Sequence, residues 1–314
     1  MKVTLGIFAD VEDLDARDFL KKLAEASGRA SVVITMTPEQ IGLLQFWFYA
    51  SRYAHIWVRF NWGYGRRGTL PLPGTKESEQ FFAAISQIYR YTNWLEGVII
   101  GNEPNNPQEW PDGKRLDPEA VASCVHWVWR RAPASLRIGP PPIDLFNAVT
   151  GNPYDYLDKM ARRLNLNGTR PEFLTVQLKT QTSASPLTQE QYCFTDPPLA
   201  GKSMNLGASM EALRILYQHL SSRILVVPEM NPQRKTTSPT FHPDDRDYGW
   251  TGDSLAATGW LLTTIQILQV SLRAFPIREV YLHVYRWARD EWAIKQREDI
   301  KDGLIQVAKL AHRA

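Results

Sequence analysis

Short, wholly apolar segments recur along this chain with helical segments between them, and this repetition most restricts its possible folds. A run that is apolar at every position is typical of a parallel strand covered on both faces. Strands that alternate with helices pair in parallel through right-handed crossovers. The eight predicted strands span residues 2–9, 31–36, 55–60, 97–101, 136–139, 173–178, 223–227 and 279–284.

The predicted helices complete this repeat. They follow Thr37-Pro38, open near Asp117, and cover residues 15–27, 77–92, 154–164, 207–220, 254–273 and 302–312. Eight strand–helix units predict one (β/α)8 barrel domain over residues 1–314, with long loops at the carboxyl ends of its strands. The alternative is an open, doubly wound sheet. It is disfavoured because the segment FADVED after the first strand lacks a glycine-rich phosphate-binding pattern.

The charge balance argues against two classes of partner. The chain has 36 basic and 33 acidic residues, a net charge of +3, which does not favour nucleic-acid binding. It has no apolar run near the roughly 20 residues needed to span a bilayer. Its amino terminus soon turns acidic and does not resemble a signal peptide, so a cytoplasmic location is expected. The sequence leaves the oligomeric state open.

Two glutamates stand where predicted strands end. Glu103 follows the fourth strand, and Glu229 follows the seventh. A carboxylate at the end of a buried strand is costly unless it is solvated or paired, so both are expected to line a pocket. Pro104 predicts an extended backbone at Glu103. Across a closed barrel the two carboxylates can approach to about 5 Å, the separation used by retaining glycosidases.

The Asn102-Glu103-Pro104 motif, together with Glu229, resembles the catalytic motifs of the clan A glycoside hydrolases, the 4/7 superfamily of retaining (β/α)8 enzymes. The resemblance implies double displacement on a β-linked sugar, with Glu103 as general acid/base and Glu229 as nucleophile. It also implies that Asn102 holds the sugar 2-hydroxyl and that Trp287 floors the subsite of the cleaved sugar. Neither a metal nor another cofactor is expected for this chemistry.

Further residues are predicted to contact a carbohydrate substrate. Arg59 on the third strand is expected at the barrel mouth, where it can pair with a catalytic carboxylate, and Asn61 follows it. Many aromatic residues fall in the long loops. Trp62, Trp250 and Trp287 are the ones predicted to stack on sugar C–H faces.

Two alternatives stay open from the sequence. The sixth strand runs into QLKTQTSAS without the His-x-Tyr-like pattern common in the clan, which favours a non-catalytic glycan-binding barrel. A metal-dependent barrel hydrolase is the second alternative, with His242, Asp244 and Asp245 as ligands. The histidines show no HExxH or other paired spacing, which makes this second alternative the weaker one.

Overall fold

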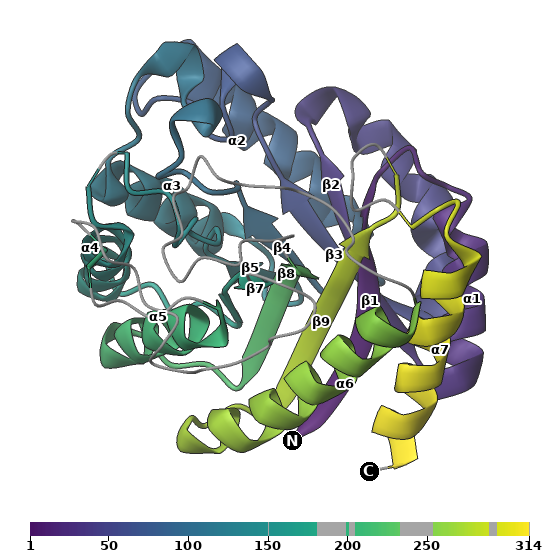
Figure 1. Ribbon diagram of the computed structural model, residues 1–314. Coiled ribbons are helices and arrows are strands. Elements are labelled where there is room, and N and C mark those ends of the chain that lie inside the picture. The colour runs from purple at the N-terminus through teal and green to yellow at the C-terminus, as the bar shows by residue number, and fades with distance from the viewer. Residues whose placement is uncertain (150, 181–198, 201–204, 233–253, 289–293, 314) are drawn as a thin grey trace.

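The computed structural model describes residues 1–149, 151–180, 199–200, 205–232, 254–288 and 294–313. Parallel strands stand side by side at the centre of the molecule, and helices surround them (Figure 1). Eight strand positions form a nearly closed barrel, which confirms the predicted (β/α)8 architecture. No helix in these ranges is long and apolar enough to cross a membrane.

Every predicted strand is present within a few residues of its expected bounds. The sheet order is β5-β4-β3-β2-β1-β9-β8-β6, and β7 also pairs with β8. The sixth predicted strand is therefore divided into two short pieces. The strands are β1 (Lys2–Asp10), β2 (Ala30–Met36), β3 (Ala54–Phe60), β4 (Gly97–Ile100), β5 (Arg137–Gly139), β6 (Leu174–Thr175), β7 (Leu178–Thr180), β8 (Ile224–Pro232) and β9 (Glu279–Arg286).

The helices follow the predicted pattern with one difference. The segment Pro38–Arg52 is a 3-10 helix, and the backbone N–H of Thr37 donates to the side chain of Gln40 at its start (3.0 Å). The α-helices are α1 (Ala16–Ser27), α2 (Lys76–Ile88), α3 (Pro118–Arg131), α4 (Pro153–Leu166), α5 (Asn205–His219), α6 (Ser254–Ser271) and α7 (Glu298–Arg313).

The barrel has a seam between β5 and β6, which do not pair as strands in the described residues. Three hydrogen bonds cross this seam. The backbone N–H of Glu172 donates to the carbonyl of Ile138 (3.3 Å), and the N–H of Ile138 donates to the Glu172 carboxylate (2.9 Å). The hydroxyl of Thr175 donates to the carbonyl of Pro140 (2.8 Å). Side chains thus replace part of the missing ladder.

Large side chains fill the lumen below the mouth of the barrel. The indole of Trp57 packs edge to face on Phe173 and Tyr281, with ring centroids 4.9 Å apart in both pairs. Residues of alternate position on each strand point inward, which places them in one layer. This inner cluster consists of Phe8, Val33, Trp57, Ile99, Phe173, Val226 and Tyr281.

A buried histidine links three strands of the barrel. His283 on β9 donates from Nδ1 to the carbonyl of Val227 (2.7 Å) and bonds through Nε2 to the hydroxyl of Ser31 (2.8 Å). Burial lowers the pKa of His283 to about 3, so the ring is neutral near pH 7. This residue therefore supports the core and is not a proton donor at the site.

The first prediction concerns Gly139, which leaves room for the ring of Phe173. A Cβ at Gly139 would lie 2.3 Å from that ring, whereas a Cβ at the control position Gly42 would meet nothing within 4 Å. We expect Gly139→Ala to lower the free energy of unfolding by about 1–3 kcal/mol, because overpacking strains a filled core. Urea unfolding of both variants measures this. An equal, small change in Gly139→Ala and Gly42→Ala would contradict the packing described here.

Candidate active site

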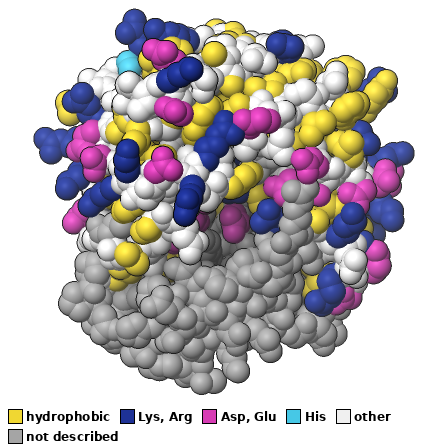
Figure 2. Space-filling view, turned by 90° about the horizontal axis from the view of Figure 1, so that it is seen from above, with side chains coloured by type: hydrophobic (Ala, Val, Ile, Leu, Met, Phe, Trp, Pro, Cys, Tyr) yellow, Lys and Arg dark blue, Asp and Glu magenta, His cyan; other side chains and the backbone are white. Residues whose placement is uncertain are grey.

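The carboxyl ends of the strands form one face of the molecule. Figure 2 views this face, with a hollow near its centre and acidic side chains beside the hollow. Parallel strands bring residues that follow different strands to the same rim. Glu103 follows β4 at the fourth position of the barrel, and Glu229 lies within β8 at the seventh position, because this strand extends five residues beyond its predicted end.

Arg59 is the central cation of the mouth. Trp57, Arg59 and Asn61 alternate along β3 and past its end, which turns Arg59 inward, two residues above the aromatic layer. Only 6% of its surface is exposed. It donates to the hydroxyl of Thr35 (3.0 Å) and to Oδ1 of Asn102 (2.8 Å). Its Nη1 lies 3.7 Å from a carboxylate oxygen of Glu229. The predicted pairing of Arg59 with one of the two glutamates is therefore present.

Glu229 lies where β8 departs from regular pairing. The register between β8 and β9 shifts between Val227 and Met230, and Glu229 falls inside that shift. An irregularity of this kind re-aims a side chain at the end of a strand. About a fifth of the Glu229 side chain is exposed. The carboxylate thus reaches both Arg59 and solvent.

Glu103 has a backbone conformation that the sequence did not predict. Its φ is +39°, in the left-handed region that residues other than glycine rarely adopt, so the expected extended backbone is wrong. The N–H of Glu103 donates to the carbonyl of Pro142 (3.0 Å), and its carbonyl accepts from the N–H of Asn106 (2.8 Å). These two bonds hold a tight turn that outweighs the preference imposed by Pro104. Such strain is found where a side chain must be held in place.

The Glu103 side chain is buried and receives two amide donors. Nε2 of Gln177 donates to Oε1 of Glu103, and Nδ2 of Asn106 donates to Oε2 (3.3 Å). Gln177 is only 2% exposed, and its side-chain oxygen Oε1 has no hydrogen-bond partner in the described part of the chain. The sequence analysis missed Gln177, although a glutamine in the apolar stretch FLTVQL is a visible signal.

Asn102 is held from two sides. Because a guanidinium can only donate, the atom of Asn102 that faces Arg59 must be its oxygen. Its backbone N–H donates to the hydroxyl of Thr69 (2.5 Å), and that hydroxyl donates to Oδ1 of Asn61 (3.2 Å). Asn61 is 1% exposed. The structure therefore places Asn61 behind Asn102, as a support, and not in contact with the mouth.

Glu109 is a third glutamate at this site, and the sequence analysis did not identify it. Nδ2 of Asn102 donates to Oε1 of Glu109 over 3.4 Å. Burial and the negative charge of Glu103 raise the pKa of Glu109 to about 7, with a smaller contribution from Glu229, while Arg59 opposes the shift. The negative charges of Glu103 and Glu229 thus both raise the pKa of the Glu109 carboxyl group.

Tyr64 is a half-exposed aromatic residue whose hydroxyl responds to the charged groups of the mouth. Burial raises the pKa of its hydroxyl to about 12, although 52% of the residue is exposed. The charges of Arg59, Asp10, Arg286 and Glu109 act on that hydroxyl. The Tyr64 residue is therefore half exposed to solvent, while its hydroxyl lies near the charged groups of the site.

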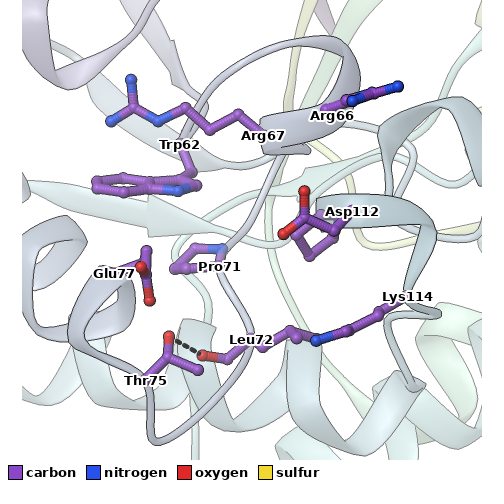
Figure 3. A pocket seen from close by; sticks show the side chains of 10 residues that line it. Trp62, Arg66, Arg67, Pro71, Leu72, Thr75, Glu77, Asp112 and Lys114 are labelled. Carbon is purple, nitrogen blue, oxygen red and sulfur yellow. Dashed lines mark hydrogen bonds between the residues drawn. The ribbon is translucent and has the colours of Figure 1, made fainter.

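Trp62 lies in a separate pocket. This pocket of about 520 Å³ is formed by the loops after β3 and β4 and the start of α2, and its lining includes neither Glu103 nor Glu229. Figure 3 shows the Arg67 guanidinium over one face of the Trp62 ring, 3.9 Å from its centroid. Trp62 is 6% exposed. The structure thus places Trp62 in a pocket that neither Glu103 nor Glu229 lines.

Trp287 packs between the barrel and its helices. Its indole N–H donates to Asp15 (3.1 Å), its ring stacks on Phe19 of α1 (5.7 Å), and Lys301 of α7 lies over it. The structure thus places Trp287 in the core beneath α1 and α7, which does not support a role as the floor of a sugar subsite. Trp250 lies outside the described residues.

The metal alternative rests on residues that the structure does not describe. His242, Asp244 and Asp245 all fall outside the described ranges. Within those ranges, no three His, Cys, Asp or Glu side chains are grouped so that they could hold a metal ion.

Comparisons with known proteins identify the class of fold. No protein-family model matches the chain, and no curated protein sequence matches it. Solved structures do match. A psychrophilic glycoside hydrolase family 10 endo-β-1,4-xylanase has a TM-score of 0.58 and 8% identity, and the match covers 98% of this chain and 96% of the xylanase.

Two further structures show the same similarity. A family 30 subfamily 8 xylanase from Clostridium acetobutylicum has a TM-score of 0.53 and 11% identity, over 98% of this chain and 71% of that one. A fungal β-1,4-galactanase has a TM-score of 0.51 and 12% identity, over 88% of each chain. These enzymes are clan A members, so the predicted resemblance is confirmed at the level of the fold.

The second prediction tests Arg59 as the residue that holds the mouth together. Arg59→Met keeps the length of the side chain but leaves Thr35, Asn102 and Glu229 without their common cation. We expect the free energy of unfolding to fall by about 1–3 kcal/mol, because buried polar groups lose a charged donor. Urea unfolding near pH 7 checks this, with Arg66→Met at an exposed arginine as the control. Equal stability of the two variants would count against the network.

Proposed function

We propose that this protein is a retaining glycoside hydrolase that cleaves β-linked sugars. One observation carries the proposal: Arg59 donates to Asn102, the residue before Glu103 at the end of β4, and pairs with Glu229 of β8, at the seventh strand position of the barrel. The shared fold with xylanases and a galactanase supports it. Two carboxyl groups at one mouth are what a double displacement requires.

The two glutamates have unequal surroundings, which suits two roles. Glu229 lies beside the Arg59 guanidinium and is partly exposed, so it is the nucleophile that attacks the anomeric carbon. Glu103 is 7% exposed and donates a proton to the departing oxygen. It then removes a proton from the water that hydrolyses the glycosyl-enzyme.

Gln177 suits the acid/base role of Glu103. Its amide N–H donates to Glu103 when that group is ionised. After a half-turn of the amide, its carbonyl oxygen can accept the proton of the carboxylic acid. One side chain can therefore serve both protonation states that the reaction needs. Tyr64 replaces Trp287 as the proposed aromatic contact of the bound sugar.

The substrate class is the next part of the proposal, and the names of two structural neighbours suggest it. The similar structures include an endo-β-1,4-xylanase and a fungal β-1,4-galactanase. We therefore propose a polysaccharide or oligosaccharide with β-1,4 links as the natural substrate. Nitrophenyl β-xyloside and β-galactoside, with xylan and galactan, form the first panel to test.

The third prediction concerns the two glutamates. We expect Glu229→Gln to lower kcat by about 10⁴-fold or more, because no nucleophile remains. Glu103→Gln should lower kcat/KM by about 10²–10⁴-fold on substrates with poor leaving groups and much less on nitrophenyl glycosides, whose departure needs little protonation. Initial-rate kinetics and NMR of the first product anomer measure both effects, and retention of configuration is expected.

Glu79→Gln is the matched control, since Glu79 is exposed on α2. Circular dichroism verifies that each variant is folded. Normal turnover by Glu229→Gln would refute the assignment. Glycan binding by the wild-type protein without cleavage of any substrate would refute catalysis and favour the non-catalytic barrel.

A further inference from the structure

Glu109 has no part in the two-glutamate mechanism, yet it contacts Asn102, the residue before Glu103. It belongs to the loop after β4, six residues beyond Glu103. Its backbone is fixed on both sides, since its carbonyl accepts from the N–H of Thr69 (2.9 Å) and its N–H donates to the carbonyl of Asn106 (2.9 Å). The side chain therefore extends from a held position toward Asn102.

Its contacts continue a chain of polar groups across the mouth. Glu109 accepts from Nδ2 of Asn102, whose Oδ1 accepts from Arg59, which in turn pairs with Glu229. The side-chain amide of Asn102 has two possible orientations, which exchange the positions of Oδ1 and Nδ2. The series of hydrogen bonds across the mouth selects one of them. Arg59 requires the oxygen on its own side, and Glu109 accepts the N–H₂ group on the other.

We propose that Glu109 is a positioning residue of this site, which orients the Asn102 amide and, through its own charge, sets the pH range over which Glu103 keeps a proton. The proposal rests on the proposed glycosidase function in its second half only. The orientation of Asn102 is a property of the folded protein whether or not a substrate is cleaved.

Charge explains the second half of the proposal. The largest effects of charge on Glu109 come from Glu103, then Arg59 and Glu229, and Glu109 itself acts on the Tyr64 hydroxyl, as do Asp10 and Arg286. Repulsion between two carboxylates is mutual. An ionised Glu109 therefore disfavours the loss of the proton from Glu103. A general acid must keep that proton at the working pH.

The linkage to stability has a definite sign. Burial and the neighbouring Glu103 charge raise the pKa of Glu109 from 4.5 to about 7 in the folded protein. The folded state thus binds this proton more tightly than the unfolded state. Its stabilising contribution is complete below about pH 4.5 and is lost as the pH rises toward about 7.

A structural experiment tests the orientation without any substrate. Proton–nitrogen NMR follows the side-chain amide of Asn102, assigned by its loss in Asn102→Ala. We expect its resonances to move with a midpoint near pH 7 in the wild-type protein and to lose this transition in Glu109→Gln. Urea unfolding should show Glu109→Gln gaining stability relative to the wild type as the pH rises from 5 to 8. An Asn102 signal that titrates identically in both proteins would overturn the orientation.

A kinetic experiment tests the effect on Glu103. Glu109→Gln keeps an acceptor for Asn102 but removes the charge, so the alkaline limb of kcat/KM should move down by about 0.5 pH unit or more. Glu109→Leu removes both. It should also lower kcat/KM about 10-fold on a nitrophenyl glycoside but not on its 2-deoxy analogue, because a misdirected Asn102 loses one hydrogen bond to the 2-hydroxyl.

Glu79→Gln again serves as the control, since it removes one negative charge at an exposed position of α2 that makes none of these contacts, and it should leave the profile unchanged. Wild-type pH profiles in both Glu109 variants would overturn the role of the charge. Absence of hydrolysis by the wild-type protein would instead refute the proposed function, and the NMR titration would still decide the role of Glu109 in orienting Asn102.

Discussion

The charge of Arg59 is the interaction on which the mouth of this barrel depends. A guanidinium buried to this degree must satisfy several donors at once, and here its partners come from β2, from the loop after β4 and from β8. It also stacks over the ring of Phe8, 4.3 Å from the centroid, which joins the charged layer to the aromatic layer beneath it. One side chain therefore connects the core with the two motifs that carry the proposed chemistry.

The barrel itself was predictable from the sequence, because its strands are apolar on both faces and its helices repeat between them. Glu103, Glu229 and Arg59 could be recognised for the same reason: a charged residue at the end of an apolar strand is conspicuous. Their positions at strand ends need no knowledge of the loops.

Other parts of the site depend on contacts between segments distant in sequence. The left-handed backbone of Glu103 follows from a bond to Pro142, which no local preference reveals. Gln177 and Glu109 acquire their importance only from what lies beside them. Trp62 and Trp287 show the opposite case, since tryptophans that seemed suited to bind sugars pack against an arginine and against helices. Composition cannot separate a stacking platform from a core aromatic.

The open seam of the barrel gives Glu103 an unusual mechanical setting. Its backbone is tied to Pro142, which follows β5, while its carboxylate is tied to Gln177, which lies between β6 and β7. These strands are the two flanks that share no ladder. The proposed proton donor therefore links the two sides of the seam. Local opening of the barrel between β5 and β6 would displace its carboxyl group. The position of the Glu103 carboxyl group, and hence the direction in which it donates its proton, therefore depends on how rigid the seam is.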